Sequence, residues 1–193
     1  MTTTNTTIEG GVEVADDKRQ RRRRMLVIAI VLMVAALVQW HRDIGLAVLG
    51  RWHHWRTGAE GVDVGMARAR VDAGAILLDV REPGEFEVSH LKGAINIPID
   101  VLLKGGLQVD GTGSPEVVLY CTIGRRSGIV AKRLSDDGLD AYNLVGGILG
   151  VADAAPDWIE SAGDRPRLHI WSSDYAWLAP PDFATVVFSE SGG

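Results

Sequence analysis

The feature that most constrains the fold is an apolar run that ends in the only cysteine of the chain. Residues 117–120 are three apolar β-formers and a tyrosine, and Cys121 follows them directly. Gly124 then precedes a helix-forming stretch over residues 126–134. This order predicts a buried strand over 117–121, a tight loop, and a helix that begins beside the thiol.

The surroundings of Cys121 predict a reactive thiol. The first backbone amides of a helix are unpaired, and the helix start carries partial positive charge. Arg125 and Arg126 add two full positive charges, and Gly124 permits a backbone conformation that side chains disfavour. These features favour the thiolate, which is the nucleophilic form. The alternative is that Cys121 is a small buried apolar residue that finishes the strand.

Spacing restricts the chemistry of this loop. Four residues separate Cys121 from Arg126, whereas related cysteine phosphatases have five residues between cysteine and arginine. Ser127 occupies the sixth position after the cysteine, and a hydroxyl cannot hold a phosphate in the bidentate manner of arginine. The loop therefore disfavours phosphatase and arsenate reductase chemistry.

Residues 121–127, Cys-Thr-Ile-Gly-Arg-Arg-Ser, resemble the C-x-x-G-x-R-S active loop of rhodanese-family sulfurtransferases. Three further blocks resemble that family in the same order, over residues 77–86, 90–98 and 142–147. Two positions depart from the family pattern. Ser89 replaces a glycine that usually precedes the histidine of the second block, His90. Val151 stands where a tryptophan often follows the double glycine, which here is Gly146-Gly147.

The resemblance implies that Cys121 takes a sulfane sulfur from a donor such as thiosulfate and carries it as a persulfide. It implies catalytic roles for Cys121 and Arg126, and no cofactor or metal. The chain has no second cysteine to resolve the persulfide, so the partners expected are a small sulfur donor and a thiol or cyanide acceptor. The loop residues expected to bind substrate are Thr122, Ile123, Gly124, Arg125 and Ser127. Asp79, Arg81 and His90 are expected to support the site structurally.

Short apolar runs and helical segments alternate after residue 60, which predicts an α/β fold. Such alternation favours a parallel sheet with helices on both faces, and it agrees with the rhodanese-like fold that the resemblance implies. Ligands bind beyond the carboxyl ends of the strands in such sheets, where Cys121 and Asp79 are expected. We expect strands over 75–80, 117–121 and 141–145, and helices over 64–71, 83–88, 98–103 and 126–134.

One transmembrane helix is expected to precede this domain, over residues 25–40. Residues 1–24 are expected to be a disordered tail that ends in a basic run, 18–24. Sixteen helical residues reach about 24 Å, against a hydrocarbon layer of roughly 30 Å. Arg24 and Trp40 can extend this reach to the two interfaces. A cleaved signal peptide is the alternative, but no small-x-small cleavage site is evident.

Charge asymmetry across this span predicts the topology. Six Lys/Arg residues lie just before it, which favours a cytoplasmic N-terminus and a catalytic domain on the exported side. Residues 41–60 form a juxtamembrane connector, and its aromatic residues are expected to contact membrane lipid. His53 and His54 lack a third metal ligand nearby in the sequence.

The catalytic domain is expected over residues 61–166, with a glycine-rich loop at 109–114. Residues 167–193 form a tail of unknown role that ends in a disordered segment, 189–193. From residue 25 onward fourteen Lys/Arg face twenty-one Asp/Glu, a net charge of −7 that opposes nucleic-acid binding. The alternative function, from a different class, is a non-catalytic rhodanese-like module that binds a partner or senses redox state.

Overall fold

The computed structural model describes residues 9–105, 107 and 115–187. The chain divides into two units, residues 1–42 and 43–193. The predictions for residues 1–8, 109–114 and 189–193 lie outside the described residues.

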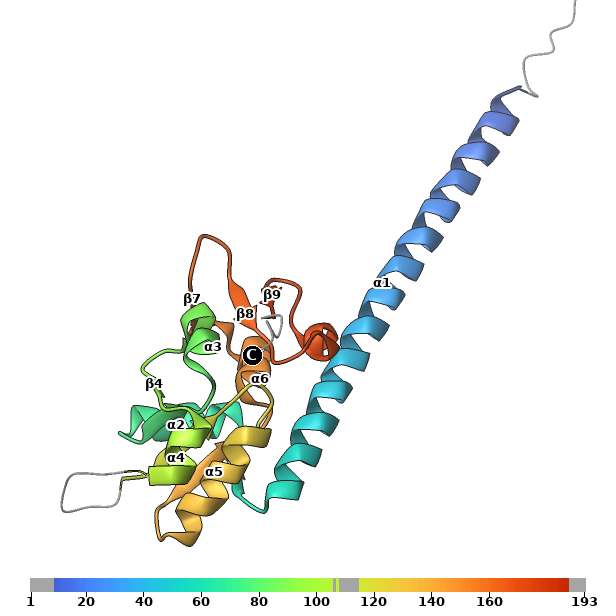
Figure 1. Cartoon of the computed structure of the whole chain (residues 1–193). Coiled ribbons are helices and arrows are strands. Elements are labelled where there is room, and N and C mark those ends of the chain that lie inside the picture. Colours follow the sequence, from blue (N-terminus) through green and yellow to red (C-terminus); the bar gives the residue numbers. More distant parts are fainter. Residues whose placement is uncertain (1–8, 106, 108–114, 188–193) are drawn as a thin grey trace, which may run out of the picture. The chain divides into compact units, whose positions relative to one another are not determined.

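The first element is one long helix, α1 (Glu9–Thr57) (Figure 1). It is longer than expected, because it includes residues 9–24, predicted to be a disordered tail, and most of the predicted connector. The basic run 18–24 consists of Lys, Arg and Gln, which are good helix formers and let the helix continue through it. Apolar side chains over residues 25–40 are exposed, including Met25 at 71% and Trp40 at 64%. Within the described residues, α1 alone is long and apolar enough to cross a membrane.

A five-stranded parallel sheet forms the centre of the second unit. Its strand order is β1-β6-β5-β2-β4, so β5, which leads to Cys121, is the middle strand. The register places Leu78 of β2 beside Leu119 of β5, and Leu119 beside Asn143 of β6. The strands are β1 (Glu60–Val62), β2 (Ile76–Asp79), β4 (Ile95–Asn96), β5 (Val117–Tyr120) and β6 (Ala141–Leu144).

Helices cover both faces of this sheet, as predicted (Figure 1). Alternate residues of β5 point to opposite faces, since side chains alternate along a strand. Tyr120 belongs to the core that includes Ala67 of α2 and Ile148 of α6, whereas Cys121 belongs to the core that includes Leu102 of α4 and Val130 of α5. The helices are α2 (Val64–Asp72), α3 (Pro83–Val88), α4 (Ile99–Gly105), α5 (Arg125–Asp136) and α6 (Gly147–Ala154).

The segment after α6 packs on the domain. Leu168, Ile170 and Leu178 are fully buried in the same core as Tyr120. This burial extends the folded unit beyond the predicted boundary at residue 166, and Leu46 of α1 extends it in the other direction. The apolar area removed from water explains both extensions. The elements are β3 (Ser89–Leu91), which pairs with β7 (Ile159–Ser161), then η1 (Pro156–Trp158), β8 (Arg167–His169), η2 (Ser173–Leu178) and β9 (Ala184–Val186).

Candidate active site

The candidate site is the loop that joins β5 to α5. Cys121 lies at the carboxyl end of the middle strand, and Gly124 has a φ of 95°, which turns the backbone into α5. The Gly124 amide donates a hydrogen bond to Cys121 Sγ at 3.2 Å. Within the described part of the chain, no acceptor is found for four other amides of this loop. They belong to Thr122, Ile123, Arg125 and Arg126.

The start of α6 supports this loop from behind. The amides of Ile148 and Leu149 donate to the carbonyls of Cys121 and Thr122, at 2.9 and 3.2 Å. Gly147 has a φ of 55°, and a Cβ there would lie 2.3 Å from the Cys121 carbonyl oxygen. Only glycine allows the two backbones to approach this closely, which gives the second glycine of the 142–147 block a physical reason.

Arg126 is held by a buried carboxylate. Its guanidinium donates to both oxygens of Glu85, at 2.7 and 2.9 Å, and lies 3.3 Å from the Thr122 hydroxyl. Glu85 is 3% exposed and lies in the first turn of α3, which Pro83 begins in the position where proline is favoured. The bidentate pair fixes the orientation of the Arg126 fork beside the loop.

Electrostatics keep both partners of this pair ionised. Burial opposes ionisation of Glu85, but contacts with His169 and Arg126, together with the charges of Arg126 and Arg81, hold the pKa of that carboxyl well below its usual range. Burial also opposes the charge on Arg126, whereas Glu85 and the nearby Cys121 sulfur raise the pKa of that guanidinium. Arg126 therefore stays charged close to Cys121.

The C-terminal segment covers this pair. The Trp171 ring lies over the Arg126 guanidinium, with 4.6 Å between Cζ and the ring centroid. The His169 amide donates to the Ser89 hydroxyl at 3.1 Å, and His169 Nδ1 lies 3.3 Å from Glu85 Oε1. Ser89, which replaces the usual glycine, thus supplies the side chain that holds β8 in place. Cys121 itself is 2% exposed.

Asp79 and Arg81 form a fully buried ion pair. The Arg81 guanidinium donates to both Asp79 oxygens at 2.6–3.0 Å and to the Ser89 carbonyl at 2.6 Å. Burial alone would lower the pKa of Arg81, but the charge and hydrogen bonds of Asp79 outweigh burial and raise that pKa above its ordinary value. Burial, and then the charge of Asp79, raise the pKa of Tyr120 well above 10, so its phenol stays neutral and accepts from the Leu91 amide at 3.0 Å. This cluster fixes the turn between β2 and α3.

Two other predicted residues make contacts away from the thiol. The buried Ser127 hydroxyl donates to Asn143 Oδ1 at 2.7 Å, and the Asn143 amide group donates to the Gly124 carbonyl at 3.0 Å. Ser127 therefore fixes the loop through Asn143. His90 stacks on Phe86 with ring centroids 4.0 Å apart, and its Nε2 lies 3.2 Å from Glu160 Oε2.

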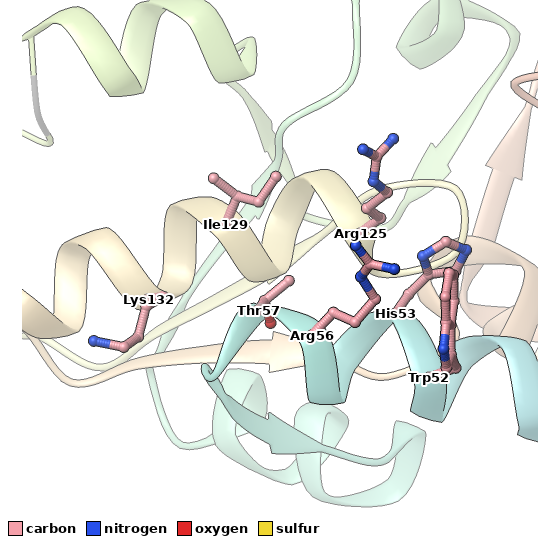
Figure 2. Close-up of a pocket in the computed structure, with 7 residues that line it drawn as sticks. All are labelled: Trp52, His53, Arg56, Thr57, Arg125, Ile129 and Lys132. Carbon is pink, nitrogen blue, oxygen red and sulfur yellow. The ribbon is translucent and has the colours of Figure 1, made fainter.

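The remaining predicted loop residues point in different directions. Ile123 is 4% exposed and packs in the core that contains Tyr120. Arg125 is exposed and lines a cavity between α5 and the end of α1 (Figure 2). The backbone of Arg125, and not its side chain, belongs to the loop.

The structure adds residues that the sequence alone did not assign to the site: Glu85, Asn143, Gly147, His169 and Trp171. The first three lie inside the blocks that resemble rhodaneses, and that position is the sequence signal that indicates them. His169 and Trp171 lie in the C-terminal segment, where no local pattern indicates contact with a loop some 40 residues earlier.

Comparisons with known proteins place this geometry in a family. Residues 63–154 match the family model of the rhodanese-like domain. The chain is 30% identical over 105 residues to a thiosulfate:glutathione sulfurtransferase of Saccharomyces cerevisiae, across 49% of this chain and 71% of the relative. It is 32% identical over 75 residues to the thiosulfate sulfurtransferase PspE of Escherichia coli, across 39% of this chain and 72% of the relative. The chain belongs to the rhodanese-like family, and its relatives include sulfurtransferases.

Two other similarities cover part of the chain. The uncharacterized Bacillus subtilis protein YqhL is 46% identical over 74 residues, which is 38% of this chain and 57% of that protein. A crystal structure of a rhodanese-related protein from Thermoplasma volcanium is 28% identical and covers 50% of this chain and 93% of that one, with a TM-score of 0.44. The family model leaves α1 and the C-terminal segment outside the matched residues.

Proposed function

We propose that this protein is a sulfurtransferase that carries sulfane sulfur on Cys121 as a persulfide. The proposal rests on the backbone amides of the Cys121 loop. The Gly124 amide nitrogen lies 3.2 Å from Sγ, and four neighbouring loop amides have no acceptor among the described residues. Such a ring of donors suits an anionic sulfur and an anionic donor.

The transfer uses thiosulfate as the simplest donor. The Cys121 thiolate attacks the outer sulfur of thiosulfate, the S–S bond of the donor breaks, and its electron pair leaves with sulfite. The new bond joins Sγ to the transferred sulfur, and the total charge of −3 is the same before and after. An acceptor thiolate or cyanide then attacks the outer sulfur of the persulfide and restores the Cys121 thiolate. The two sulfurtransferases to which the chain is similar support thiosulfate as the donor class.

Arg126 contributes positive charge and fixes the loop. Its fork is bound to Glu85 and its NH2 group lies near the Thr122 hydroxyl, so the guanidinium holds its place while negative charge develops on sulfite. Removing one such electrostatic group costs about 3 kcal/mol, or roughly 100-fold in rate. We therefore expect Arg126→Ala to slow donor turnover by about that factor and Cys121→Ser to abolish transfer.

The experiment is mass spectrometry of the full chain in detergent after incubation with thiosulfate. We expect the parent to gain one sulfur atom on Cys121, and sulfite to appear in equal amount. Cyanide added afterwards should remove that sulfur and yield thiocyanate. If the parent and Cys121→Ser release sulfite at the same rate, this function is wrong.

The burial of Cys121 favours a second candidate, a non-catalytic module that binds a partner or senses redox state. A thiol that is 2% exposed is poorly placed for rapid exchange with solvent. This candidate predicts no sulfur gain with any donor, but binding of a protein partner that survives Cys121→Ser. The same mass measurement therefore separates the two functions.

We also propose that α1 anchors the protein in a membrane, with its N-terminus in the cytoplasm and the rhodanese-like domain on the exported side. The exposed apolar side chains over 25–40 and the basic run before them support this arrangement. Protease added to intact cells or spheroplasts should digest the domain from outside. Protection of the domain until the membrane is lysed would reverse the proposed orientation.

A further inference from the structure

The cavity that Arg125 lines lies beside the Cys121 loop, on the face of α5 that carries Ile129 and Lys132. It has a volume of about 560 Å³ and is lined by the last turns of α1 and the first turns of α5. This volume falls within the range of roughly 300–1,000 Å³ that small-molecule sites occupy. Figure 2 shows the lining residues, which are Trp52, His53, Arg56, Thr57, Arg125, Ile129 and Lys132.

The lining is strongly basic. Arg56, Arg125 and Lys132 bring three positive charges to one cavity, and no acidic residue is among the described residues that line it. Lys132 pairs with Asp136, but neither Arg56 nor Arg125 has a carboxylate partner within the described part of the chain. Residues 25–193 carry a net charge of −7, so the cavity is a local exception to the charge of the protein.

Arg56 and Arg125 carry like charges without a carboxylate partner among the described residues, so they repel one another. They also disfavour a positive charge on the nearby His53. His53, buried on the same helix as Arg56, has its pKa lowered by burial and then by the charges of Arg125 and Arg56. Trp52 forms the apolar wall, with the Arg56 guanidinium 4.8 Å from its ring centroid. Arg125 is also the first residue of α5, where the helix end adds partial positive charge. An anion in the cavity removes this repulsion.

We propose that this cavity binds the phosphate group of an anionic ligand, held between Arg56 and Arg125 and against Trp52. Arginine forks bind phosphate oxygens in the bidentate manner, and the cavity is larger than an inorganic sulfur donor needs. The phosphate can belong to a soluble metabolite or to a lipid headgroup, since the last turns of α1 continue the helix proposed to cross the membrane. The site is separate from the Cys121 loop and does not depend on sulfur transfer.

The test is calorimetric titration of the full chain in detergent with inorganic pyrophosphate. We expect one binding site per chain and at least a roughly tenfold weaker affinity in Arg56→Gln, as for a lost charged hydrogen bond. The matched control is Arg133→Gln, because Arg133 lies on α5 outside this lining, is 62% exposed and pairs with Asp137. Equal pyrophosphate affinity in Arg56→Gln and the parent, or no saturable binding to the parent, overturns the proposal.

Two further measurements identify the source of the phosphate and separate this proposal from the sulfurtransferase function. In nanodiscs that contain phosphatidylglycerol, a lipid ligand competes with pyrophosphate, whereas a soluble ligand leaves the affinity as it is in phosphatidylcholine nanodiscs. Both results keep the site. Cys121→Ser should bind pyrophosphate as the parent does although it transfers no sulfur, and loss of binding in that variant would contradict a separate site.

Discussion

Gly147 offers a direct test of how the loop is built. Its φ of 55° is left-handed, and a Cβ would lie 2.3 Å from the Cys121 carbonyl oxygen and 2.7 Å from the Thr122 carbonyl carbon. Left-handed backbone costs a non-glycine residue about 1–2 kcal/mol, and forcing a methyl group into a packed site costs about 1–3 kcal/mol more. We therefore expect Gly147→Ala to lower the free energy of unfolding by about 2–5 kcal/mol.

Gly138→Ala is the matched control, because Gly138 has a φ of 91° and a Cβ there meets nothing within 4 Å. It reports the backbone cost alone, so the difference between the two variants isolates the clash with the loop. For a domain of this size a difference of about 1–3 kcal/mol corresponds to roughly 2–12 °C in Tm. Thermal unfolding by circular dichroism measures it, and persulfide formation should fall only in Gly147→Ala. Equal Tm values in the two variants would refute the contact between α6 and the loop.

Three other changes test the surroundings of the loop. Glu85→Gln leaves Arg126 without its buried partner and should cost about 3–5 kcal/mol at pH 7 in urea unfolding. Because the pKa of Glu85 is depressed in the folded state, its contribution to the free energy of unfolding is present above the unfolded pKa of about 4.3 and lost as pH falls. The parent should therefore lose more stability on acidification than Glu85→Gln. Parallel pH profiles of the two proteins would contradict this. Trp171→Ala removes an exposed ring stacked on Arg126, so it should cost no more than about 1 kcal/mol while iodoacetamide alkylates Cys121 faster; an unchanged alkylation rate means that Trp171 does not cover the thiol. Ser89→Gly removes the acceptor of the His169 amide and should increase proteolysis of residues 167–187 without abolishing the fold, as limited chymotrypsin digestion would show.

Much of the central fold was predictable because local patterns and sheet architecture agree. The apolar run before Cys121 and the helix after it became β5 and α5, and alternating strands and helices became a parallel sheet covered on both faces. The short strands β1 and β4 were missed, because two or three residues carry no periodicity.

The surroundings of the thiol were harder to predict because they depend on contacts distant in sequence. Glu85 binds Arg126, 41 residues further along the chain, and no local pattern indicates that pairing. Trp171 and His169 come from a segment whose aromatic residues are scattered between turn residues, and only tertiary packing places them on Arg126 and Glu85. Charge counting near Cys121 found Arg125 and Arg126 but could not indicate that one is paired and covered while the other lines a separate cavity.

The most direct test of the proposed function is the mass of the peptide that contains Cys121, measured after the full chain is incubated with thiosulfate. The proposal predicts a gain of one sulfur atom on the peptide that contains Cys121, reversed by cyanide and absent in Cys121→Ser. An unmodified Cys121, with sulfite release no greater than in Cys121→Ser, would contradict it.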